Sequence, residues 1–161
     1  MKKNLSFEGE WMPPSTANNP TQQRFEYPGL LVKDFEHWSV TLRRHQVTLG
    51  ALVLLAKSNV TAWPELDRTA FTELKDVTVS IERSLSALFG YDKINYLMLM
   101  MVDPNVHFHV FPRYQRTVAF ADIDFADAGW PKAPDLASGP TLDDDMAMRL
   151  IAHMKSDWRD A

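Results

Sequence analysis

Cysteine is absent from the 161-residue chain, so the sequence excludes disulfide frameworks, thiolate metal sites and a cysteine nucleophile. No apolar run approaches the length of about 18 residues that a membrane span needs. Basic residues do not outnumber acidic ones: 17 against 21 give a net charge of −4, which argues against general binding to nucleic acid or to an anionic membrane. The rest is ordinary globular composition, with 45% hydrophobic and 24% charged residues.

The N-terminus also lacks a secretory signal. The stretch Met1–Glu8 is charged and has no apolar h-region, so we expect a cytoplasmic protein. Residues 1–28 are rich in proline and predict an irregular N-terminal arm. Residues 29–161 have the length of one domain, and we expect a single domain that includes the C-terminal tail and helix.

The middle of the chain shows both strand and helix periodicities. Gly29–Leu42 has the rough alternation of one or two strands, and Gly50–Ala56 has the composition of a buried strand. The stretch Pro64–Asp67 marks the start of a helix whose apolar residues recur every three or four positions until Gly90. The polar stretch Arg43–His45 predicts a hairpin turn; a local basic patch for an anionic substrate is the alternative.

Two further strands are expected at about Lys93–Met101 and Val106–Phe111, with Pro112 at the end or edge of the second. Residues 115–140 should be mostly loop. Thr141, followed by Asp144, resembles the N-terminal cap of a last amphipathic helix. The order of elements indicates an α+β fold: a mainly antiparallel sheet, one long central helix and a C-terminal helix.

The chemistry is concentrated in the second of these strands. Because side chains alternate between the faces of a strand, Asn105, His107 and His109 point to one side, about 7 Å apart. Such a row could supply a nucleophile and a proton donor for phosphoryl or nucleotidyl transfer. It could also be a pair of metal ligands, or two half-buried structural histidines.

The same strand resembles the signature of the histidine triad (HIT) family, in which three histidines alternate with apolar residues and Pro-Arg follows. The matching residues are His107, His109, the apolar Val106, Phe108, Val110 and Phe111, and the pair Pro112-Arg113. Upstream, Asp92–Tyr96 and Leu49–Leu54 are similar to strands of bacterial members that resemble diadenosine-polyphosphate hydrolases, as are Phe35–Trp38 and Gly129–Pro131. The resemblance covers about Phe35 to Pro131.

This resemblance implies an α+β nucleotide hydrolase or transferase, commonly a homodimer, that needs neither metal nor cofactor. It places the nucleophile, which becomes covalently nucleotidylated, at His107, and the residue that contacts the scissile phosphate and helps the leaving group depart at His109. Asn105, Asn95 and Arg113 are the expected substrate-binding residues. The expected partner is a nucleotide, either a dinucleoside polyphosphate or a nucleoside phosphoramidate, and no nucleic acid or membrane.

Two positions depart from the family pattern. Asn105 stands where the family has its first histidine, and Ala51 stands where many members place another histidine after glycine. These departures leave open a non-catalytic nucleotide-binding or regulatory protein of the same fold. A metal-dependent hydrolase with His107 and His109 as ligands is the third possibility, although the sequence shows no obvious third ligand.

Overall fold

The computed structural model describes residues 17–161, which form a five-stranded sheet, a two-stranded hairpin and three α-helices. The elements are, in chain order, α1 (Pro20–Arg24), β1 (Leu31–Asp34), β2 (Trp38–Leu42), β3 (Leu52–Ala56), the 3-10 turn η1 (Trp63–Glu65), α2 (Arg68–Phe89), β4 (Lys93–Leu97), β5 (His107–Arg113), β6 (Val118–Phe120), β7 (Ile123–Phe125) and α3 (Asp144–Ser156).

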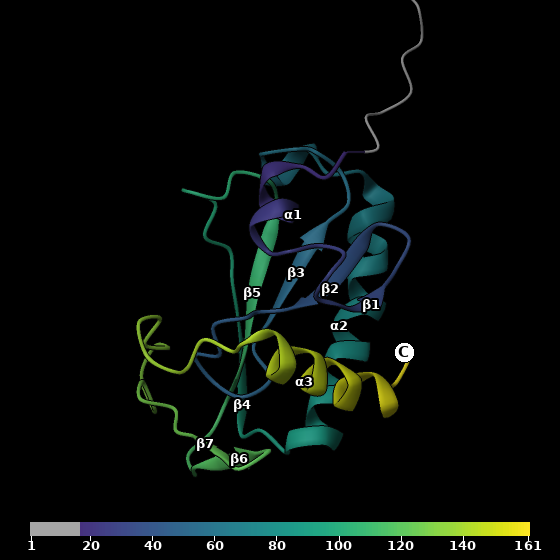
Figure 1. Ribbon diagram of the computed structural model, residues 1–161. Helices are drawn as coiled ribbons and strands as arrows, with labels where there is room; N and C mark the ends of the chain where they lie inside the picture. Colours follow the sequence, from purple (N-terminus) through teal and green to yellow (C-terminus); the bar gives the residue numbers. More distant parts are fainter. Residues whose placement is uncertain (1–16) are drawn as a thin grey trace, which may run out of the picture.

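The five-stranded sheet has the order β1-β2-β3-β5-β4, and all its neighbouring strands are antiparallel. Strand β5 therefore lies inside the sheet, between β3 and β4, whereas β4 is an edge strand. Figure 1 shows the long helix α2 behind the sheet and the short helix α1 in front of β5 and β3. The expectation of an α+β fold with a mainly antiparallel sheet, a long central helix and a C-terminal helix is confirmed.

Helix α2 forms where the apolar spacing predicts it. Its buried positions include Val77, Ile81 and Leu85, which recur at four-residue spacing and pack into the main core. The helix ends at Gly90, which adopts a left-handed conformation with a φ of 58° while its N–H donates to the Ser86 carbonyl. A residue without Cβ adopts this conformation at little cost, so glycine makes a sharp helix end.

The two faces of the sheet have different chemistry. Residues directly opposite each other on antiparallel strands share a face. Val40, Leu54 and Phe108 pair in this way and belong to the core that α2 covers. The neighbouring row of Val53 and His109 points to the opposite face, over which α1 lies. The alternation expected for β5 thus turns its imidazoles away from the core under α2.

Two local expectations from the sequence are wrong. Residues 20–24 are not irregular: the side chain of Asn19 accepts from the N–H of Gln22, and these residues form a capping box at the start of α1. Residues 115–140 are mostly loop, as expected, and contain the short hairpin β6–β7. The cap of the last helix is Asp143, whose carboxylate accepts from the N–H of Met146, while Thr141 instead pairs with His45.

Two strand boundaries also differ. Strand β4 ends at Leu97, short of the expected Met101. Strand β5 continues through Pro112 to Arg113. Proline fits there because the pairing with β3 ends at Val110, so Pro112 has only β4 as a strand neighbour. In the part of the chain that the structure describes, no helix is both long and apolar enough to span a bilayer.

Candidate active site

Asn105, His107 and His109 lie together on the face of the sheet opposite α2. Asn105 lies two residues before the start of β5, and the two histidines occupy the first and third positions of this strand. All three are buried: 5% of Asn105 and 7% of His109 is exposed, and nothing of His107. The two imidazole centroids are 5.1 Å apart, with the rings nearly perpendicular. The structure therefore brings together the row that the strand period predicts.

The tautomer of His107 is fixed by the backbone. Its Nδ1 lies 2.7 Å from the carbonyl oxygen of Asn105, which can only accept a hydrogen bond, so Nδ1 carries the hydrogen. The remaining nitrogen, Nε2, is left with a free lone pair. This atom is buried and has no hydrogen-bond partner among the described residues. A neutral imidazole held in this way is prepared for nucleophilic attack.

His109 is held neutral by its surroundings. Burial, with smaller contributions from the nearby charges of His107 and Arg43, lowers the pKa of His109 to about 4. Its Nδ1 is also buried and has no hydrogen-bond partner within residues 17–161. At neutral pH the ring therefore carries one N–H, with which it can donate a hydrogen bond to an anionic oxygen, and it does not carry a positive charge.

Phe25 covers both imidazoles, and sequence reasoning missed it as a site residue. Its ring centroid lies 5.5 Å from that of His107 and 5.4 Å from that of His109. On the other side, the ring of Phe111 is nearly parallel to His109, at 6.1 Å. The two histidines thus lie in an aromatic cage, which lowers the local dielectric and strengthens hydrogen bonds inside it.

Asn105 connects the site to two other segments. Its backbone N–H donates to the hydroxyl of Thr21 in α1, and its side-chain amide donates to the Asn59 carbonyl, at 3.0 and 2.9 Å. The side-chain carbonyl oxygen, Oδ1, is buried with no partner in the described residues. Asn105 thus holds the segment that leads into β5 against α1 and Asn59. Its Oδ1 remains as a hydrogen-bond acceptor near the imidazoles.

Arg113 and Asn95 belong to a separate network at the far end of β5. The guanidinium of Arg113 forms a fork with the carboxylate of Asp127, at 2.6 and 2.9 Å, and both side chains are almost wholly buried. It also donates to Asn95 Oδ1 and to the Lys132 carbonyl. The donors of Arg113 are therefore occupied within the chain, which is the arrangement of a structural ion pair. Contact of Arg113 or Asn95 with substrate stays a prediction.

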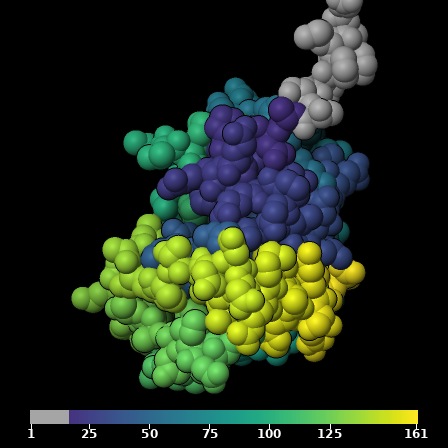
Figure 2. Space-filling model, in the orientation of Figure 1, coloured from purple at the N-terminus to yellow at the C-terminus, as the bar shows by residue number. Residues whose placement is uncertain are grey.

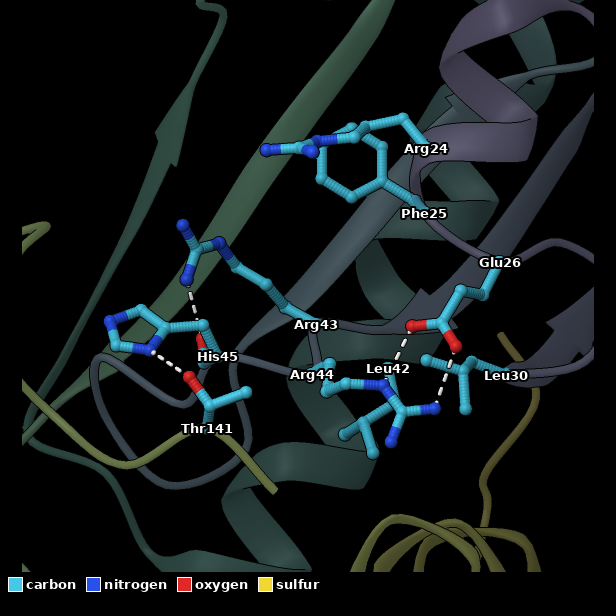
Figure 3. A pocket seen from close by; sticks show the side chains of 9 residues that line it. All are labelled: Arg24, Phe25, Glu26, Leu30, Leu42, Arg43, Arg44, His45 and Thr141. Atoms are coloured by element: carbon cyan, nitrogen blue, oxygen red, sulfur yellow. Dashed lines mark hydrogen bonds and ion pairs between the residues drawn. The ribbon is translucent and has the colours of Figure 1, made fainter. Parts of the chain in front are cut away.

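A cavity of about 310 Å³ adjoins the aromatic cage. Its nine lining residues come from α1, from the loop after it, from the end of β2 and the stretch that follows, and from Thr141, and all are labelled in Figure 3. Phe25 is common to the cavity and the cage. Arg43, Arg44 and His45 all line it, so the stretch that connects the antiparallel strands β2 and β3 also forms one wall of the cavity.

Metal ligands are not gathered at this site. Among residues 17–161, no three or more histidine, aspartate or glutamate side chains are grouped so that they could hold an ion. His107 and His109 are therefore two candidate metal ligands, and the described residues supply no third ligand beside them.

Comparison with known proteins identifies the fold. No family model matches the sequence, and no curated protein matches it. Among solved structures, a histidine triad protein from Sinorhizobium meliloti 1021 is 18% identical with a TM-score of 0.65, over 84% of this chain and 93% of that one. A histidine triad protein from Marinobacter aquaeolei VT8 is 20% identical with a TM-score of 0.63, over 80% and 87%.

A third similar structure is the diadenosine triphosphate hydrolase of Plasmodium falciparum, which is 10% identical with a TM-score of 0.59, over 80% of this chain and 76% of that one. The chain therefore has the fold of histidine triad proteins. The resemblance noted in its sequence is confirmed at the level of the fold.

Proposed function

We propose that this protein is a nucleotide hydrolase or nucleotidyl transferase that acts at the α-phosphate of its substrate through a covalent intermediate on His107. One observation carries the proposal: the Asn105 carbonyl holds Nδ1–H of His107, which leaves Nε2 as a free lone pair beside His109. The substrate class that fits is a dinucleoside polyphosphate or a nucleoside phosphoramidate. The similarity to a diadenosine triphosphate hydrolase supports the same class.

In the first step, Nε2 of His107 attacks the α-phosphorus, a P–N bond forms, and the bond from phosphorus to the leaving group breaks. The leaving group departs with the bonding electron pair. The imidazole then carries a positive charge, and the Asn105 carbonyl stabilises it by accepting from Nδ1–H. Because the acceptor is a backbone atom, this support does not depend on the side chain at position 105.

In the second step, a water oxygen bonds to phosphorus and the P–Nε2 bond breaks. The electron pair returns to His107, the nucleoside monophosphate is released, and the proton from water passes to solvent. His109 donates its single N–H to a phosphate oxygen in both steps and so stabilises developing negative charge. With a pKa of about 4 in the free protein, His109 acts as a hydrogen-bond donor in this scheme and not as a pre-formed acid.

A non-catalytic nucleotide-binding protein is the second candidate, and one observation favours it. Nothing of His107 is exposed in this structure, because Phe25 lies over the imidazoles. Together with Asn105 in place of a third histidine, this arrangement also suits a site that binds a nucleotide and does not turn it over. This candidate predicts stabilisation by AMP without product.

The test is intact-protein mass and product release with diadenosine triphosphate and adenosine phosphoramidate, with and without a chelator. Wild-type protein should release AMP in the presence of chelator, or gain the mass of one nucleotidyl group, and His107→Ala should do neither. His153→Ala is the matched control because His153 is exposed on α3. AMP release that persists in His107→Ala would refute the mechanism, and release that the chelator abolishes would favour a metal-dependent one.

We also propose that the protein is a homodimer, with an interface on the β4 edge of the sheet. Strand β4 has β5 as its one sheet neighbour, so its outer backbone groups are open to another strand. The following loop exposes Leu99, Met101 and Val102, and Figure 2 shows that part of the chain as a projection at upper left. Sedimentation should give twice the monomer mass for wild type and the monomer mass for Met101→Asp. A wild-type monomer would refute this proposal.

A further inference from the structure

Two arginines that line the cavity have no acidic partner among residues 17–161. Arg24 is exposed at the end of α1, and its guanidinium has no hydrogen bond or ion pair with the described residues. Arg43 is partly buried after β2; its Nη1 donates to the His45 carbonyl, and its buried Nε has no partner in the described part of the chain. Figure 3 shows both guanidinium groups extended toward the same side of the cavity.

The one acidic residue that lines this cavity is already engaged. Both oxygens of Glu26 accept from Arg44, at 2.6 and 2.7 Å, and Arg44 also contacts Asp144 at 2.9 Å. Arg24 and Arg43 are therefore left as two neighbouring positive charges. Burial lowers the pKa of Arg43, and the charge of Arg24 lowers it further. Like charges without a counterion destabilise the empty site, and an anion that binds between them removes that repulsion.

The cavity that holds the arginine pair is connected to the imidazoles through two aromatic rings. The guanidinium carbon of Arg43 is 5.5 Å from the centroid of the Phe111 ring, which stacks on His109. Phe25, which follows Arg24 in the chain and also lines the cavity, contacts both imidazoles. A substrate bound at the imidazoles therefore has the cavity with the two arginines beside its reacting centre.

We propose that Arg24 and Arg43 bind the phosphate groups of an anionic leaving group, so that the site selects dinucleoside polyphosphates over nucleoside phosphoramidates. This inference rests on the proposed function and specifies its substrate class. A guanidinium matches phosphate oxygens with parallel N–H donors, and the free Nε of Arg43 is one such donor. The leaving amine of a phosphoramidate carries no phosphate and gains nothing from the pair.

The size of the cavity agrees with this role. A volume of about 310 Å³ is at the lower end of the range of roughly 300–1,000 Å³ typical of small-molecule sites. The α-phosphate itself is assigned to the imidazoles, whereas the arginines line the cavity that Phe25 connects to them. The arginines are therefore left for the phosphates beyond it.

The test compares kcat/KM for diadenosine triphosphate and for adenosine phosphoramidate in wild type, Arg24→Gln and Arg43→Gln. Loss of a charge-assisted hydrogen bond should lower kcat/KM for the polyphosphate by about tenfold to a hundredfold and leave the phosphoramidate within about threefold. Arg43→Lys, which keeps the charge, should recover part of the loss. Arg149→Gln is the control for net charge, since Arg149 is exposed on α3.

An equal loss for both substrates, or no loss for either, would overturn the leaving-group assignment. If wild type turns over neither substrate, the proposed function fails, and calorimetry with inorganic pyrophosphate decides the inference by itself. Binding that is at least about tenfold weaker in Arg24→Gln than in wild type and in Arg149→Gln then supports the arginine pair as an anion site. Absence of binding, or equal affinity in all three proteins, overturns it.

Discussion

Acid should destabilise this protein through His109. The ordinary pKa of 6.5 applies in the unfolded chain, whereas the folded protein lowers the pKa of His109 to about 4 because the ring is buried and faces the charges of His107 and Arg43. Between these two values the unfolded state binds a proton that the folded state does not. Stability is therefore complete above about pH 6.5 and is lost as the pH falls toward 4, by about 3 kcal/mol.

The assay is urea-induced unfolding of wild type and His109→Gln at intervals between about pH 7 and pH 4. Carboxylates titrate in both proteins and cancel in the difference, so wild type should lose about 3 kcal/mol more than the variant. His153→Gln, on the exposed side of α3, should follow wild type. If the curves of wild type and His109→Gln run parallel, or if an NMR titration places the pKa of His109 above 6, the reasoning is refuted.

Four more substitutions test the site and the residues that support it. Asp127→Asn and Arg113→Gln should each lower the free energy of unfolding by about 3–5 kcal/mol, because each leaves a buried partner unpaired. If Arg113→Gln loses turnover and Asp127→Asn does not, the predicted contact of Arg113 with substrate is supported. Gly139→Ala should lower the free energy of unfolding by at least about 2 kcal/mol in chemical denaturation, because φ is +93° and the new Cβ would lie 2.0 Å from the Gln46 carbonyl oxygen. A loss below about 1 kcal/mol would contradict this reasoning. Asn105→Ala should cost about 1 kcal/mol and reduce turnover only a few-fold, because the carbonyl that holds His107 is retained, and complete inactivity would contradict that assignment.

The parts of the fold that the sequence predicted are those with a strong local period. Helix α2 keeps one apolar face over six turns, and β5 alternates between apolar residues and the Asn-His-His row. The placement of His107 and His109 on one face follows from that alternation alone. The role of Asn105 as the acceptor for His107 does not follow from it, because the accepting atom belongs to the backbone.

The features that were missed have weak or distant signals. Helix α1 is only five residues long, although Asn19, Pro20 and Gln22 are the N-cap, N1 and N3 residues of a capping box and could have indicated it. The β6–β7 turn uses Ala121 and Asp122, both with positive φ, where a glycine would ordinarily mark the turn.

The substrate side of the site could not be predicted for a different reason. Phe25 and Arg43 are brought to the imidazoles by segments that lie more than sixty residues before them in the chain. No periodicity connects such positions. Likewise, no pattern in the sequence connects Arg113 with its ion-pair partner Asp127, which lies fourteen residues further along the chain.

The position of the histidines within the sheet has a consequence for local stability. The amides of His109 and Val110 lie between two paired strands, β3 and β4, whereas His107 pairs with β3 alone. We expect the hydrogens of this interior strand to exchange with solvent only on near-global unfolding. Helix α1, by contrast, has five residues and should open at a much lower free energy. Phe25 follows this helix and contacts the fully buried His107, so we expect ligand entry to His107 to accompany such an opening. The nucleophile would then keep its place on an interior strand while the segment above it opens.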